Sequence, residues 1–81
     1  MKVVQTYSSK ECNEFEIVVN DVTIAYYIEH FKHPINANVL EKPMYEIYYD
    51  YNEDDDDYTS SIVTDNYNEL QDVIDSIYNM L

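Results

Sequence analysis

The chain has 81 residues and a formal net charge of −13, from seventeen acids and four lysines. This length predicts one domain, residues 1–81, with a modest hydrophobic core. The excess of acids and the lack of arginine argue against direct binding to nucleic-acid phosphates, and no apolar run is long enough for a membrane span. Cys12 is the single cysteine, so no internal disulfide forms and we expect a reducing cytoplasm.

The negative charge is unevenly distributed along the chain. All four lysines precede Pro43, whereas residues 43–81 contain eleven acids and no Lys, Arg or His, and so carry −11. Such asymmetry is typical of an interaction surface rather than of a solubility adjustment. The alternative is an ordinary acidic domain whose charge is incidental.

Two short features open the chain. Residues 2–7 predict an edge strand. Ser8-Ser-Lys-Glu11 has the Ser-x-x-Glu spacing of a helical capping box but no apolar stripe, so we expect either a turn or one short helix over residues 9–13.

The clearest hairpin spans residues 14–20 and 22–31, where apolar and polar residues alternate on both sides of Asn20-Asp21. In a chain without glycine, Asn and Asp best suit a two-residue turn. This turn predicts three facing pairs on the core side of the sheet, namely Val19 with Val22, Ile17 with Ile24, and Phe15 with Tyr26.

Residues 32–43 predict a connection bounded by Pro34 and Pro43, with Ile35, Val39 and Leu40 tucked under the sheet. Residues 44–51 then alternate as a strand, whose partner is residues 58–64. Its predicted core side is Tyr45, Ile47 and Tyr49, with Met44, Glu46, Tyr48 and Asp50 on the other side. The five acids Glu53 to Asp57 join the two strands.

Residues 66–81 predict the one helix. Asn66 is a good N-cap and Glu69 occupies the capping-box position. The apolar stripe at helical spacing is Tyr67, Leu70, Val73, Ile74, Ile77, Tyr78 and Leu81. These elements together predict an α+β fold, with an antiparallel sheet of three to five strands and one C-terminal helix packed on it.

Catalytic and metal chemistry find little support. Cys12 with His30 or His33 is the only nucleophile–base combination, and such scattered residues are more often structural, so we predict no enzyme and no catalytic residue. Asp54 to Asp57 lack the glycine and distal glutamate of a calcium-binding EF-hand. We therefore predict no metal ion and no cofactor.

The predicted binding surface is an anionic ridge with two tyrosine anchors. Outward residues recur every ~6.6 Å on a strand and ~5–6 Å on a helix, a spacing that suits mimicry of the phosphates of DNA. On the helix, the like-charge neighbours Glu69, Asp72 and Asp75 have no lysine to compensate them, and such local costs often mark function. The complete predicted ridge is Glu46, Tyr48, Asp50, Tyr51, Glu53, Asp54, Asp55, Asp56, Asp57, Glu69, Asp72 and Asp75.

Small size, acidity, a hairpin-and-helix plan and richness in Asn, Ile, Tyr and Asp resemble the small acidic inhibitors of bacteriophages. These include anti-CRISPR proteins that occupy the DNA-binding cleft of a CRISPR effector, and the uracil-DNA glycosylase inhibitors. The resemblance implies a non-enzymatic DNA mimic, above all an anti-CRISPR protein. Such a protein is expected to act in the host bacterial cytoplasm and to have no membrane partner.

Its implied partner is a basic nucleic-acid-binding protein, either a CRISPR effector nuclease or a DNA repair or restriction enzyme. The inhibitor itself is expected to be a monomer or a homodimer. The alternative function is an acidic protein–protein interaction module, such as an antitoxin-like or regulatory subunit, with no nucleic-acid mimicry.

Overall fold

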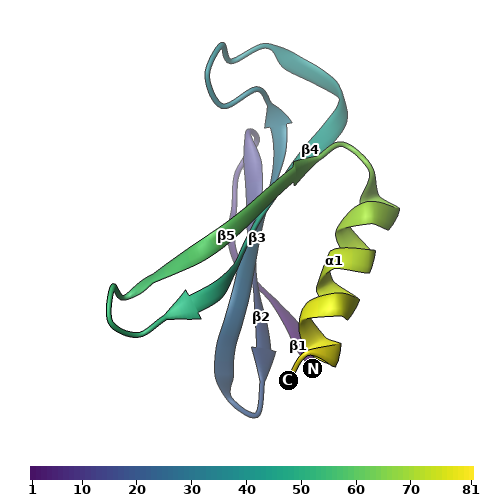
Figure 1. The fold of residues 1–81 in the computed structure, drawn as a ribbon. Helices are drawn as coiled ribbons and strands as arrows, with labels where there is room; N and C mark the ends of the chain where they lie inside the picture. Colours follow the sequence, from purple (N-terminus) through teal and green to yellow (C-terminus); the bar gives the residue numbers. More distant parts are fainter.

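The computed structural model describes residues 1–81 and contains one five-stranded antiparallel sheet and one helix (Figure 1). The elements in chain order are β1 (Lys2–Ser8), β2 (Cys12–Val19), β3 (Val22–Lys32), β4 (Val39–Asn52), β5 (Asp57–Thr64) and α1 (Tyr67–Asn79). The strands follow one another across the sheet in sequence order. The predicted α+β fold is confirmed.

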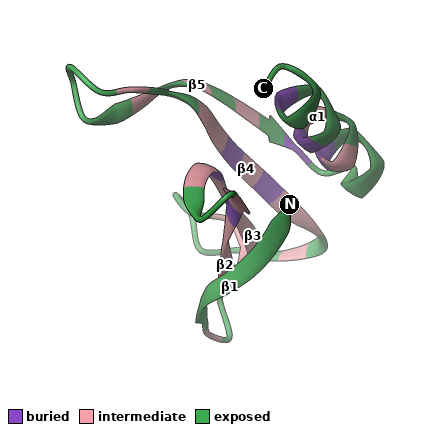
Figure 2. Cartoon of the chain, turned by 90° about the horizontal axis from the view of Figure 1, so that it is seen from below, coloured by how far each residue is buried: buried purple, intermediate pink, exposed green.

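The single helix covers one part of a strongly twisted sheet. It packs on β4 and β5, while β1, β2 and β3 extend away from it (Figures 1 and 2). The buried core consists of Ile17, Ala25, Tyr27, Tyr45, Ile47, Leu70, Ile74 and Ile77. Since no second layer lies on the opposite side, that face of the sheet stays uncovered.

The helix begins at the predicted cap. The Asn66 side chain accepts hydrogen bonds from the backbone N–H groups of Asn68 (2.9 Å) and Glu69 (3.4 Å), which satisfies two of the free donors at the helix start. The predicted stripe is too long at both ends. Leu70, Ile74 and Ile77 are buried, but Tyr67, Tyr78 and Leu81 are exposed, although the Tyr67 ring still packs edge-on against Tyr45 of β4 at 5.9 Å.

The predicted β2–β3 turn is confirmed, but the predicted register holds only for the pair next to the turn. Asn20 and Asp21 both have positive φ (51° and 65°), as a tight hairpin turn with two left-handed residues requires. Val19 faces Val22, but a bulge at Ile24 then shifts the pairing. The actual partners are Ile17 with Ala25 and Phe15 with Tyr27.

The bulge changes which side chains form the core. Because side chains alternate with a period of two, one extra residue moves all later ones to the opposite face. Ala25 and Tyr27 are consequently buried, whereas Tyr26 lies on the uncovered face.

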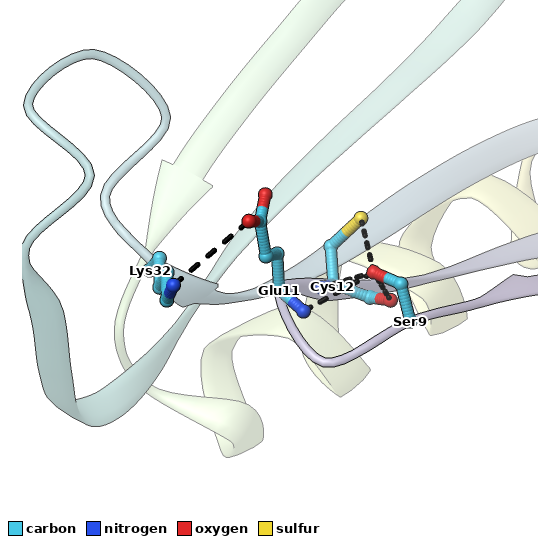
Figure 3. A network of polar contacts seen from close by, with 4 residues as sticks. All are labelled: Ser9, Glu11, Cys12 and Lys32. Carbon is cyan, nitrogen blue, oxygen red and sulfur yellow. Dashed lines mark hydrogen bonds and ion pairs between the residues drawn. The ribbon is translucent and has the colours of Figure 1, made fainter.

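Residues 9–11 form the β1–β2 turn, so of the two alternatives predicted here the turn is present and the short helix is not. The Ser9 hydroxyl accepts hydrogen bonds from the N–H groups of Glu11 (3.1 Å) and Cys12 (3.2 Å) (Figure 3). These are the bonds of a helix cap, but the chain continues as a strand. Lys32 Nζ lies 3.8 Å from the Glu11 carboxylate and ties this turn to the end of β3 (Figure 3).

The connection before β4 is shorter than predicted, since β4 already begins at Val39. The loop closes on itself, with hydrogen bonds from Ala37 N–H to the His33 carbonyl and from His33 N–H to the Asn38 carbonyl. It projects beyond the sheet, so Ile35 and Val39 are exposed rather than tucked under it, and only Leu40 is half-buried.

Replacing Ile74 with alanine tests the helix–sheet contact. Ile74 is 2% exposed, so Ile74→Ala should lower the free energy of unfolding by about 2–5 kcal/mol, measured by chemical denaturation. Ile35→Ala is the matched control, because Ile35 is 90% exposed and its loss should change stability by less than about 0.5 kcal/mol. Equal effects of the two substitutions contradict this core.

A second stability prediction concerns Ala37, the one residue with positive φ that is neither Asn nor Asp (φ 58°). A left-handed conformation costs an L-residue about 1–2 kcal/mol, which glycine avoids. Ala37→Gly should therefore raise the melting temperature. Ala25→Gly, the same change in a buried strand position, should lower it. A lower melting temperature for Ala37→Gly contradicts the left-handed turn.

Candidate protein-binding surface

Most carboxylates of the protein have no cationic partner. Of the seventeen acids, only Glu11 lies within ion-pair distance of a lysine, Lys32, while Glu46 shares a hydrogen bond with His30. The last turn of α1 contains no basic residue. The negative potential is therefore little neutralised within the molecule, and it is available to attract a basic partner.

The predicted ridge residues lie in three places. Glu46 and Tyr48 belong to the sheet face opposite α1, because they alternate with the buried Tyr45 and Ile47. We call this side of the sheet the outer face. Asp50, Tyr51 and Glu53–Asp57 lie at the β4–β5 hairpin tip, and Glu69, Asp72 and Asp75 on α1.

A row of tyrosine rings links the outer face to the hairpin tip. The rings of Tyr26 and Tyr48 stack with centroids 4.8 Å apart, and Tyr58 packs edge-on against Tyr26 at 5.2 Å. Tyr51 continues the row, with its ring 5.4 Å from that of Tyr58. Such cross-strand aromatic contacts stabilise the sheet and place rigid rings on an uncovered surface.

Glu46 is held by two neighbours on the outer face. Its Oε1 lies 2.6 Å from His30 Nε2, and its Oε2 accepts a hydrogen bond from the Tyr48 hydroxyl at 2.7 Å. This hydrogen bond, and then burial, raise the pKa of Tyr48 to about 12. Tyr48 is therefore a neutral phenol at physiological pH, with its ring orientation fixed by Glu46.

Carboxylates also surround the other rings of the row. Glu14 and Glu16 on β2 share the outer face, since Glu16 is the cross-strand partner of Tyr26. Burial and then the charges of Asp57, Glu14 and Glu46 raise the pKa of Tyr26, and burial followed by Glu16 raises that of Tyr58. Neutral aromatic faces within a negative potential are favourable sites for a lysine or arginine side chain.

The acidic turn at the hairpin tip is ordered by its own side chains. The Asn52 side chain accepts a hydrogen bond from Asp54 N–H (2.9 Å) and donates one to the Asp55 carboxylate (3.3 Å). The Tyr51 hydroxyl donates to Asp56, which raises the Tyr51 pKa. Residues Glu53–Asp57 remain exposed, so their charges face solvent in a defined arrangement.

Asp50 occupies an unusual position within β4. Its φ is 58°, and its carboxylate accepts a hydrogen bond from the Ser60 hydroxyl at 2.9 Å. It borders a hollow of about 300 Å³ together with Ile77 and Met80 near the C-terminal end of α1. The left-handed conformation thus turns Asp50 toward the helix side, although alternation predicted it on the same side as Glu46.

The helix acids form a separate group. The Glu69 carboxylate accepts a hydrogen bond from the Thr64 hydroxyl (3.0 Å), whose oxygen accepts one from Asn66 N–H (3.1 Å), so Glu69 supports the helix cap. Glu69 and Asp72 border a second hollow of about 300 Å³ between α1 and the sheet. Because α1 covers the opposite side of the sheet, these acids do not join Glu46 and Tyr48 in one ridge.

Sequence reasoning missed several outer-face residues. Tyr26 was predicted in the core because the bulge at Ile24 has no sequence signature. Glu14 and Glu16 lay on the predicted polar side of the same hairpin, and their alternation with Phe15 and Ile17 was a usable signal. The ring of Tyr58 on β5 packs on Tyr26 of β3 across the intervening strand β4, a contact that alternation along single strands does not predict.

Cys12, His30 and His33, the candidate nucleophile and bases, each have a hydrogen-bond partner other than one another. Cys12 is the cross-strand partner of His30, but its sulfur has its hydrogen-bond contact with the Ser9 hydroxyl, at 4.0 Å (Figure 3). His33 Nδ1 accepts hydrogen bonds from the backbone N–H groups of Ile35 and Asn36. No group of three or more His, Cys, Asp or Glu residues is arranged to hold a metal ion.

Comparison with protein-family models, curated proteins and solved structures found no match to this chain. The structure contains no helix with the length and apolar character needed to cross a membrane. Its function is therefore inferred from the surface described above.

The Glu46–Tyr48 contact predicts a fall in stability at high pH. The Tyr48 pKa is about 12 in the folded protein and about 10 unfolded, so the unfolded state loses its proton first as pH rises. The stabilisation is fully present below pH ~10 and is lost as pH rises toward ~12. Denaturation across this range should show a smaller fall for Tyr48→Phe, and an equal fall in both proteins contradicts the contact.

Proposed function

We propose that the protein is a non-enzymatic inhibitor that binds the basic nucleic-acid-binding cleft of a nuclease or DNA repair enzyme. The target class that we favour is a CRISPR effector nuclease in the cytoplasm of a host bacterium. One observation carries the proposal. The uncovered outer face and the hairpin tip present stacked tyrosines beside carboxylates, few of them ion-paired, as one continuous surface.

The carboxylates supply the attraction. A cleft that binds nucleic acid is lined with lysine and arginine, and its potential draws in any dense array of negative charge. Glu53–Asp57 places five acids in one exposed, ordered turn at the extreme end of the molecule (Figure 1). This turn enters the cleft first and replaces phosphates there.

The tyrosines supply affinity and selectivity. Charge alone gives fast association but weak discrimination, whereas aromatic side chains commonly dominate the binding energy of an interface. Tyr48 and Tyr51 lie at the two ends of the ring row, and Tyr51 is 47% exposed. Arginines that normally contact phosphates can stack on these rings while they pair with the neighbouring carboxylates.

We restrict the proposed contact surface to the outer face and the hairpin tip. Asp72 and Asp75 on the other side of the molecule contribute to the long-range field but not to contact with the same cleft wall as Glu46. The proposed contact residues are therefore Glu46, Tyr48, Tyr51 and Glu53–Asp57, with Tyr26, Tyr58, Glu14 and Glu16 added.

The alternative, an acidic interaction module without mimicry, uses the same surface. The two functions predict different results when nucleic acid is added. A basic partner that is bound outside its nucleic-acid cleft still binds nucleic acid. The two functions are thus separated by whether a ternary complex forms.

Neutralising the acidic turn tests the steering role. The quadruple change of Asp54, Asp55, Asp56 and Asp57 to asparagine lowers the charge from −13 to −9 and preserves hydrogen-bond acceptors in the turn. Association with a purified guide-loaded CRISPR effector should slow at least ~10-fold in stopped-flow measurements, and thermal stability should stay level or rise.

A charge-matched control separates position from net charge. Changing Glu11, Asp21, Glu41 and Asp65 to their amides also gives −9, but these exposed acids lie outside the proposed surface. The association rate of this variant should fall much less than that of the turn variant. If both variants associate equally slowly, only the net charge matters. If the turn variant associates at the wild-type rate, the mimicry proposal is wrong.

Truncating a tyrosine tests the anchoring role. Tyr51→Ala should weaken binding by ~10-fold or more, mainly through faster dissociation, as expected for an interface anchor. Tyr78→Ala is the control, since Tyr78 on α1 is similarly exposed (45% against 47%) but outside the surface. Surface plasmon resonance measures both rates, and equal behaviour of the two variants contradicts the assigned anchor.

A further inference from the structure

The β1 strand (Lys2–Ser8) is the only element of the fold without an acidic residue. It also lies at one edge of the sheet and pairs with β2 alone. All seven of its residues are exposed, and Figure 2 shows the strand exposed along its whole length. An edge strand of this kind is a template for pairing with another strand.

We propose that β1 pairs with β1 of a second copy of this chain, antiparallel, so that two sheets join into one of ten strands. This inference is independent of the proposed function. A second copy is the occupant that the strand fits best, because an antiparallel pair of identical strands has two-fold symmetry, the commonest symmetry of soluble oligomers.

The existing strand register selects how the two copies meet. A bulge between Gln5 and Tyr7 interrupts β1, so the regular segment is Lys2–Gln5. A symmetric antiparallel pair is centred on one residue, which faces the same residue of the second copy. With Val3 at the centre, every pair of facing residues lies before the bulge. Val3 then faces Val3 of the second copy, and Lys2 faces its Val4.

This register brings opposite charges together. Val4 is the β2 partner of Glu16, so Lys2 of one copy lies across two strand spacings, about 10 Å of backbone, from Glu16 of the other. Extended lysine and glutamate side chains on the same face cover this distance. By symmetry the contact forms twice.

Other edges and faces are less suitable for a like-charged copy. β5, the opposite edge strand, starts at Asp57 after four further acids and is followed by Asp65. Two molecules of charge −13 repel each other at long range, and β1 is where they approach with the least repulsion. Added salt should therefore strengthen this dimer, whereas it weakens binding to a basic partner.

The joined segment is short, so the dimer is weak, with a Kd on the order of 0.1–1 mM. Sedimentation equilibrium of the full chain measures it against the monomer mass of 9.7 kDa. We expect dimer at millimolar protein, increasing with sodium chloride. A monomer at every concentration and salt overturns the proposal.

Val3→Glu places two glutamates opposite each other at the symmetry axis, so it should abolish the dimer. Val63→Glu on β5 is the control, since it makes the same charge change at a similarly exposed site (58% against 48%). An equal effect of both variants overturns pairing through β1. Circular dichroism confirms that each variant is folded.

A charge exchange provides the sharpest test. Lys2→Glu should weaken the dimer, and Glu16→Lys should weaken it too, although that change reduces the net charge to about −11 and the long-range repulsion with it. The double variant restores opposite charges and should restore wild-type dimerisation. A stronger dimer for Glu16→Lys alone, or no restoration, shows that the predicted contact does not form.

Discussion

The packing of α1 on one side of the sheet is the contact on which the rest of the structure depends. Leu70, Ile74 and Ile77 provide the buried helix side, and they belong to one core cluster with Ile47 from β4 and Ile17 from β2. A single short helix can cover only one face of a five-stranded sheet. The sheet therefore has one buried side and one outer face, and the outer face must be stabilised by its own side chains.

Tyrosine meets this requirement. The ring row buries aromatic surface between neighbouring strands and keeps hydroxyl groups at the solvent, where Glu46 and Asp56 accept their hydrogen bonds. The same arrangement lets the outer face tolerate many nearby carboxylates, because phenols remain neutral and donate to them. A stable sheet and a surface suited to a basic partner thus arise from one set of residues.

The sequence was sufficient to predict the helix and strands and their arrangement, but not the face of the sheet on which each side chain lies. Alternation, the Asn20-Asp21 turn and the Asn66 cap correctly predicted the sheet, its central hairpin and the helix, because each has a local physical signal. The bulge at Ile24 and the left-handed Asp50 have none, and each turns side chains to the other face. As a result, Tyr26 lies on the outer face rather than in the core, and Asp50 lies on the helix side. The acids of α1 are separated from Glu46 for a different reason, because α1 packs on the opposite side of the sheet.

We propose that the outer face and the hairpin tip occupy a nucleic-acid-binding cleft of the partner protein. The most direct measurement is native mass spectrometry of a guide-loaded CRISPR effector nuclease mixed with this protein and a target DNA duplex. If the protein and the DNA exclude each other, only effector–protein and effector–DNA complexes form, and their ratio shifts as either competitor is titrated. A stable ternary complex of effector, protein and DNA contradicts the account and supports an interaction module that leaves the cleft open.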